Sequence, residues 1–251
     1  MTGLDEPTLL AGFIVFCRIG TCISFAPGFS SPRVPVRFRL LVALGLTAAL
    51  APVVLADFSS GSINADVARL VSLILRECAV GATMGIMSRL VFASLELTFT
   101  VASMAVGLSS SFAPRVDDGD SMPELAALVL FATTTMLFVA DIHWQIVHAI
   151  FDSYRAFPLG ARIEPQFALG RIVETLSFGL SLAFRLASPF IAFGLIANFS
   201  FALLNKIAPQ IAIYFVIAPI VLFGGLALLP LLWRDIATRF LAGFSDWLWR
   251  L

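Results

Sequence analysis

From Val67 to Phe112 the chain reads VARLVSLILRECAVGATMGIMSRLVFASLELTFTVASMAVGLSSSF, a largely apolar stretch without a proline. The hydrocarbon core of a bilayer is about 30 Å thick, so a helix of about 20 residues crosses it. The stretch is too long for one perpendicular crossing, and it predicts a bent pair of helices that meet between Arg89 and Glu96. It therefore indicates a helical membrane protein and leaves the number of spans at six or seven.

The composition of the whole chain leads to the same class of protein. Of its 251 residues, 59% are hydrophobic and 13% are charged, and the mean hydropathy is +0.97. Soluble domains carry about 25% charged residues. Sixteen basic and sixteen acidic residues give a net charge of zero, so the basic surface that binds nucleic acid is absent. We therefore predict a chain in contact with membrane lipid, or buried among other subunits, and no nucleic-acid partner.

Five further regions have the length and apolar character of membrane helices. One begins at a capping box formed by Ser121 and Glu124, with Pro123 in its first turn. Prolines interrupt two others and predict kinks. The expected bounds are Thr8–Phe25, Leu40–Ala56, Ser121 to Phe151, Arg171–Asn205 with a kink at Ser188–Pro189, and Gln210–Trp233 with a bend at Pro219. Together with the region 67–112, these predict an all-α, polytopic integral membrane fold of about six to seven kinked apolar helices arranged as hairpins.

The basic residues of the connections give an expected orientation. They fall on one side of the membrane if the region 67–112 crosses it twice. Because positive loops stay in the cytoplasm, this distribution predicts a cytoplasmic C-terminus. The residues are Arg33, Arg37, Arg39, Arg155, Arg162, Arg171, Arg234 and Arg239.

One stripe of polar and small residues stands out within the apolar helices. Glu77, Gly81, Gly85 and Arg89 recur every four residues. Their side chains share one face of a helix, on which two glycines form a groove between opposite charges. Small residues let another helix approach closely. The stripe predicts either packing within the chain or a contact with another subunit.

No residue pattern predicts catalysis, a cofactor or a metal ion. Signatures for nucleotides, nucleophilic serines and helical zinc sites are absent. Asp141, Gln145 and His148 share a helix face, but His143 points elsewhere, so the two histidines do not converge on a metal. This face predicts a hydrogen-bonded structural surface or a proton relay. Cys17, Cys22 and Cys78 lack paired spacing and are expected to be inert.

Two stretches of the chain are distinctive: FCRIGTCISFAPGFSSPRVPVRFRLLVALGLTAALAP, residues 16–52, and LLNKIAPQIAIYF, residues 203–215. The first is similar to the N-terminal signature of the FliR family of type III secretion export-apparatus proteins. The second resembles that family's Leu-x-Arg/Lys-x-x-Pro-Gln-x-x-x-Phe block. Residues 76–85, 106–126 and 138–143 resemble further elements in the same order, although Ile142 replaces the glycine before the histidine. The family-signature positions are Arg18, Pro27, Pro35, Asp141, His143, Lys206, Pro209 and Gln210.

The resemblance implies a function and a set of partners. It implies a structural, pore-forming component of the flagellar type III protein export gate in the bacterial inner membrane, within the flagellar basal body and needed for flagellum biogenesis. The implied partners are FliP, FliQ and FlhB-type subunits and unfolded flagellar export substrates. Two alternatives stay open: an injectisome homologue that exports effectors, and a secondary transporter whose Asp141 and Glu174 bind ions.

The resemblance also implies a division of the chain. One membrane domain, residues 1–251, would comprise N-terminal helices (1–112), a plug-like loop (113–123) and C-terminal helices (124–251). The plug would consist of small and apolar residues in this loop and just before it. Such residues suit a flexible obstruction in a pore. Without the resemblance, the same residues predict an ordinary surface turn. These residues are Gly107, Leu108, Ser109, Ser110, Ser111, Phe112, Met122 and Pro123.

Overall fold

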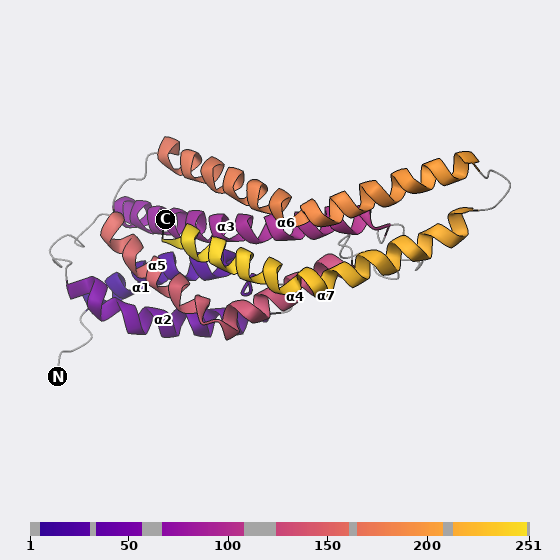
Figure 1. Ribbon diagram of the computed structural model, residues 1–251. Coiled ribbons are helices and arrows are strands. Elements are labelled where there is room, and N and C mark those ends of the chain that lie inside the picture. The colour runs from indigo at the N-terminus through magenta and orange to yellow at the C-terminus, as the bar shows by residue number, and fades with distance from the viewer. Residues whose placement is uncertain are drawn as a thin grey trace. The chain divides into compact units, whose positions relative to one another are not determined.

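The computed structural model of the protein describes residues 6–30, 34–56, 67–107, 124–160, 165–207 and 213–249, and every regular element in these ranges is an α helix (Figure 1). The helices follow one another through short connections or through residues outside the described ranges. Their bounds are α1 Glu6–Phe25, α2 Val36–Ala56, α3 Val67–Ala105, α4 Glu124–Val139, α5 Ile142–Ala156, α6 Pro165–Ile207 and α7 Ile213–Leu248.

Five of these helices are long and apolar enough to cross a membrane. They are α1, α2, α3, α6 and α7, and the number becomes six if the broken pair α4 and α5 counts as one span. The predicted all-α, polytopic membrane fold is confirmed.

The region that was expected to form a bent pair of helices is one uninterrupted helix. α3 runs for 39 residues, which at about 1.5 Å per residue is far longer than a bilayer core. Polar side chains do not break it, because Ser88 Oγ donates to Met84 O at 3.0 Å and Thr98 Oγ1 to Ser94 O at 2.8 Å. The expectation of two helices here is wrong, and the predicted orientation of the C-terminus, which required two crossings, loses its basis.

A second difference lies between Glu124 and Ala156, where one helix was expected to run to Phe151. The chain instead forms α4 and α5, separated by Ala140 and Asp141. Asp141 has a φ of 56°, in the left-handed region that Asp tolerates better than most residues. The helix therefore stops at a residue that the apolar pattern does not mark. Ser121 and Pro123 of the expected capping box lie outside the described residues.

The prolines predicted to interrupt the last two helices lie inside them. α6 begins at Pro165 and continues through Pro189, and α7 continues through Pro219 and Pro230 to Leu248. α6 thus extends beyond its predicted bounds at both ends, and α7 extends past Trp233 to Leu248. The kinks at Pro189 and Pro219 stay predictions.

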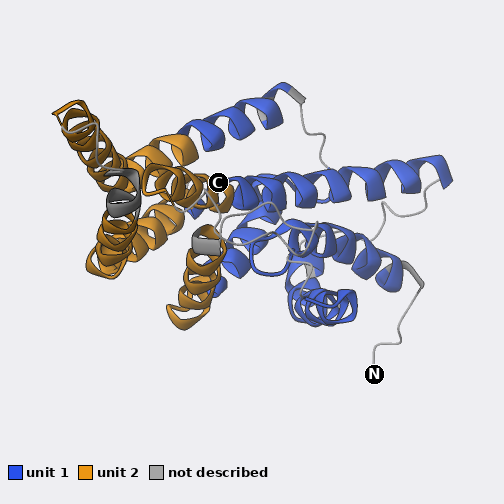
Figure 2. Ribbon diagram, turned by 90° about the vertical axis from the view of Figure 1, so that its right-hand side faces the viewer, with its two compact units in different colours: residues 1–91, 143–177, 248–251 blue, residues 92–142, 178–247 orange. Residues whose placement is uncertain are grey.

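The chain divides into two compact units, each assembled from separate segments (Figure 2). Unit 1 comprises residues 1–91, 143–177 and 248–251, and unit 2 comprises residues 92–142 and 178–247. α3 and α6 contribute to both units. The expected single domain with its three segments stays a prediction.

Unit 1 has an aliphatic core. α1 contributes Val15 and Ile19, α3 contributes Val80, and α5 contributes Ile150, all of them buried. The same three helices carry the buried charged and polar residues described below.

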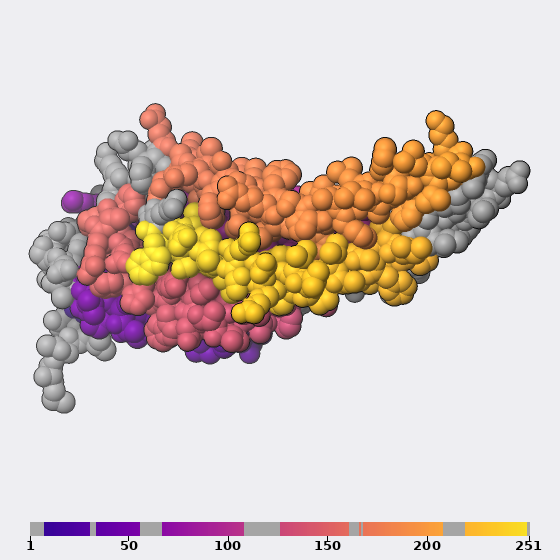
Figure 3. All heavy atoms as spheres, in the orientation of Figure 1, coloured from indigo at the N-terminus to yellow at the C-terminus, as the bar shows by residue number. Residues whose placement is uncertain are grey.

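Unit 2 has an aromatic core. The ring of Phe92 meets those of Phe240 and Phe244 edge to face, with centroids 5.1 and 5.2 Å apart. Such arrangements stabilise beyond the area that they bury. In the same unit α6 and α7 lie along each other (Figures 1 and 3), and the ring of Phe193 packs against Gly224.

Candidate functional site

A buried ion pair occupies the interior of unit 1. Arg18 on α1 and Glu77 on α3 have side chains that are each 1% exposed, and Arg18 Nε lies 2.6 Å from Glu77 Oε2. A buried charge is strongly unfavourable unless it is paired and its remaining donors or acceptors are satisfied. The other atoms of both groups therefore decide whether this pair holds the helices together.

The guanidinium of Arg18 is satisfied by α5 and the residue that follows it. Its NH1 donates to the carbonyl of Ser153 at 3.2 Å and to Ser153 Oγ at 3.4 Å. Its NH2 donates to Phe157 O at 3.0 Å. The guanidinium carbon lies 4.1 Å from the ring centroid of Tyr154, a cation–π distance, and the Tyr154 hydroxyl donates to Val15 O on α1 at 3.3 Å.

The second oxygen of Glu77 is satisfied by the turn after α5. Gly160 N donates to Glu77 Oε1 at 2.9 Å, and Arg76 NH1 donates to Gly160 O at 3.2 Å. Gly160 has a φ of 80°, a conformation that glycine adopts without strain. We call Arg18, Glu77, Ser153, Tyr154 and Gly160 the charge centre; it joins α1, α3, α5 and the turn after α5.

Two glycines bring α1 close enough to α3 for this ion pair to form. A Cβ on Gly81 would collide with the carbonyl oxygen of Arg18 and with the Thr21 hydroxyl. A Cβ on Gly85 would lie 2.6 Å from Cys22 O. In this structure the helix in the groove of the polar and small stripe is α1 of the same chain. Arg89, the last residue of that stripe, is exposed.

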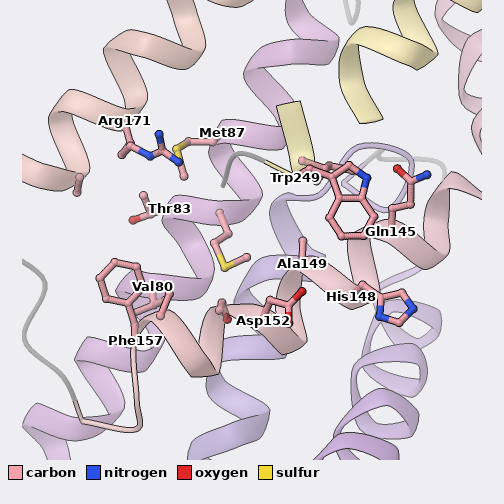
Figure 4. Close-up of a pocket in the computed structure, with 15 residues that line it drawn as sticks. Val80, Thr83, Met87, Gln145, His148, Ala149, Asp152, Phe157, Arg171 and Trp249 are labelled. Atoms are coloured by element: carbon pink, nitrogen blue, oxygen red, sulfur yellow. The ribbon is translucent and has the colours of Figure 1, made fainter. Parts of the chain in front are cut away.

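Beside the charge centre, unit 1 contains a pocket of about 180 Å³. Gln145, His148 and Asp152 reach it from α5, and Arg171 reaches it from α6 (Figure 4). Asp152 and Arg171, the charged side chains that line the pocket, each form an ion pair. Asp152 Oδ1 lies 3.3 Å from Arg155 NH1, and Glu174 Oε2 lies 3.0 Å from Arg171 NH1. Gln145 Oε1 is buried and has no hydrogen-bond partner among the described residues.

The structure separates the residues proposed as one polar helix face. Gln145 and His148 lie on α5 and line the pocket, whereas Asp141 lies in the break before α5 and is exposed. His143, in the first turn of α5, is partly buried. Within the ranges that the structure describes, no group of three or more His, Cys, Asp or Glu side chains is arranged to hold a metal ion.

The predicted plug-like residues fall mostly outside the described residues. Gly107 lies two residues beyond the end of α3 with a φ of 80°, and its amide donates to Met104 O at 3.1 Å. The others, Leu108, Ser109, Ser110, Ser111, Phe112, Met122 and Pro123, are not described.

The family-signature positions are spread over both units. Pro27 is buried in the turn after α1, Pro35 is exposed just before α2, and Lys206 is exposed in the last turn of α6. Arg18 lies in the charge centre, and Asp141 and His143 flank the start of α5. Pro209 and Gln210 lie outside the described residues.

Comparison with known proteins places this chain in a family. The sequence model of "Bacterial export proteins, family 1" matches residues 9–247. The chain belongs to this family of bacterial export proteins. Three relatives are each named flagellar biosynthetic protein FliR. The relative from Caulobacter vibrioides is 30% identical over 224 residues, 89% of this chain and 88% of the relative.

The other two relatives of this export family are more distant. The protein from Escherichia coli is 27% identical over 222 residues, 88% of this chain and 83% of the relative. The protein from Aquifex aeolicus is 24% identical over 233 residues, 90% of this chain and 86% of the relative. The resemblance to the FliR family is therefore confirmed, and the chain is a multi-pass membrane member of the bacterial export proteins.

Proposed function

We propose that this protein is a structural, pore-forming subunit of the flagellar type III protein export gate. On this proposal it lies in the bacterial inner membrane, within the flagellar basal body, and assembles with FliP, FliQ and FlhB-type subunits. Unfolded flagellar proteins are the substrates that pass the gate. The observation that carries the proposal is the family match over residues 9–247, together with relatives named flagellar biosynthetic protein FliR.

The arrangement of the described residues supports a structural rather than a catalytic role. The charge centre uses its buried polar atoms to join three helices and one turn. Leu41 and Leu44 on α2 are 66% and 60% exposed, as expected of a helix surrounded by lipid or by other subunits. Both features suit a subunit whose role is to hold a shape within an assembly.

The plug-like loop belongs to the same proposal. Gly107 to Pro123 would obstruct the resting pore and yield to an incoming chain. Deleting Ser109 to Ala113 is then expected to let ions leak through the resting gate. Membrane conductance measured in cells carrying the deletion tests this, with full-length chain at the same membrane level as the control. Unchanged conductance would contradict the plug.

A clean deletion of the gene in its native host tests the function itself. Hook and filament subunits are expected to disappear from the culture supernatant, to remain detectable in the cell pellet and to return to the medium when the gene is supplied on a plasmid. Immunoblots of both fractions provide the measurement. Normal flagellar secretion in the deletion strain would overturn the flagellar role; effector secretion and solute uptake would then be measured in the same strain.

A further inference from the structure

α6 carries a row of polar and small residues on a face that the structure leaves exposed. Ser181, Arg185, Ser188 and Ala192 follow one another at spacings of four, three and four residues, and all four are exposed. These spacings place them on one side of the helix. We call this row the Arg185 face. It lies inside Ala168–Ile207, a span apolar enough to cross a membrane.

Large apolar side chains border the Arg185 face. Phe184 on one side and Ile196 on the other are 63% and 68% exposed. The polar row is therefore about one residue wide, unlike a broad wall of polar side chains that would line a water-filled passage. Lipid is also a poor neighbour for it, because a guanidinium within a hydrocarbon core requires a partner or water.

Among the residues that the structure describes, Arg185 has no such partner. Its guanidinium makes no hydrogen bond or ion pair with any residue in the described ranges. The neighbouring hydroxyls are already satisfied by their own helix, since Ser181 Oγ donates to Phe178 O and Ser188 Oγ to Arg185 O, both at 2.8 Å. The face thus presents one unpaired positive charge between small side chains that need no further partner.

We infer that the Arg185 face is the docking surface for a membrane helix of another subunit, and that this helix carries an Asp or Glu level with Arg185. Small residues let two helices approach closely in a membrane, and a carboxylate supplies the charge that Arg185 lacks. A second copy of this chain docking through the same face would bring two guanidinium groups together. The inference rests on the proposed function, because it requires an assembly of different membrane subunits.

Charge reversal in the intact assembly tests the inference. The tagged chain is purified from membranes with mild detergent, and the retained FliP, FliQ and FlhB-type subunits are quantified by mass spectrometry. Arg185→Glu is expected to lower the retention of at least one subunit tenfold or more, whereas Arg185→Lys keeps most of it. Arg69→Glu serves as the matched control, because Arg69 is exposed in the first turns of α3 rather than in mid-span.

The outcomes of this purification separate the two proposals. Equal retention by the wild-type chain and by Arg185→Glu overturns the docking surface alone. If the wild-type chain retains none of the three subunits, the docking surface and the proposed function both fail. Suppressors of Arg185→Glu provide a positive identification: they are expected to change an Asp or Glu in a membrane helix of the affected subunit to Lys or Arg.

A labelling experiment covers the case in which Arg185→Glu fails to accumulate. Ser181→Cys and Ser188→Cys are placed singly in a chain whose three native cysteines are replaced by alanine. A membrane-impermeant maleimide is expected to label both positions in the detergent-separated subunit and to leave them at least fivefold less labelled in the intact assembly. Equal labelling in the two states would show that water lines the face and would overturn the inference.

Discussion

At the scale of single residues, Arg18 shows how a charge is accommodated in the interior of unit 1. Its guanidinium meets a carboxylate, two backbone carbonyls and an aromatic ring. Removing one partner of such a pair is more harmful than removing both, because the remaining charge is left buried without compensation.

Arg18→Leu is therefore expected to destabilise the protein by about 3–5 kcal/mol, the usual result of breaking a buried pair. The double variant Arg18→Leu, Glu77→Leu should lose less than Arg18→Leu alone, since no uncompensated charge remains. Thermal unfolding in detergent and the membrane level of each variant check this. A double variant less stable than the single one would contradict the expectation.

Exchanging the two charges is not expected to restore stability. In an Arg18→Glu, Glu77→Arg variant, the new carboxylate would face the carbonyl oxygens of Ser153 and Phe157 instead of donors. The new guanidinium would face the amide of Gly160, which also donates. The swapped chain should thus unfold at a temperature no higher than that of Arg18→Leu. Wild-type stability in the swapped chain would mean that the pair alone, and not its surroundings, matters.

At the scale of elements, the contact between α1 and α3 depends on a missing side chain. Gly81 faces the carbonyl of Arg18 directly, so even one methyl group requires the helices to separate. Gly81→Ala is expected to cost about 1–3 kcal/mol through overpacking. Gly45→Ala on α2 is the matched control, because nothing lies within 4 Å of a Cβ there. Equal melting temperatures of the two variants would contradict this close contact.

The break between α4 and α5 depends on the conformation of Asp141. A β-branched residue at a φ of 56° should cost about 1–2 kcal/mol, whereas glycine adopts this region freely. Asp141→Val is therefore expected to lower the unfolding temperature and Asp141→Gly to leave it nearly unchanged. If both substitutions had the same effect, the side chain of Asp141 rather than its backbone would determine the break.

At the scale of the whole molecule, the helices that could cross a membrane expose large apolar side chains. Leu44 is 60% exposed near the middle of α2. An arginine at the centre of a membrane helix costs about 2.5–3.5 kcal/mol on insertion scales. Leu44→Arg should therefore reduce the fraction of chain that resists alkaline extraction from membranes.

Val36→Arg provides the control for that experiment. Val36 is the first residue of α2, where a long basic side chain can reach the polar surface of the bilayer. This variant should remain membrane-bound like the wild-type chain. Equal extraction of the two arginine variants would mean that α2 does not span the bilayer with Leu44 near its centre.

The membrane fold and the family were both evident from the sequence. Apolar runs of membrane length predict helices without any knowledge of their neighbours, and five helices of that kind are present. The motifs around Arg18 and Lys206 were sufficient for the family resemblance. The stripe of small and polar residues at every fourth position also marked Gly81 and Gly85 as a place of close approach, although it left the approaching helix open.

The partners of the buried charges were decided by the tertiary structure. Arg18 meets Glu77 across 59 residues and Ser153 across 135, and Glu77 meets Gly160 across 83. Helical periodicity relates residues within a few turns of each other, so it contains no information on such pairs. The break at Asp141 and the continuity of α3 were missed for a related reason. An apolar pattern reports which residues avoid water, while backbone conformation and local hydrogen bonds determine where a helix ends.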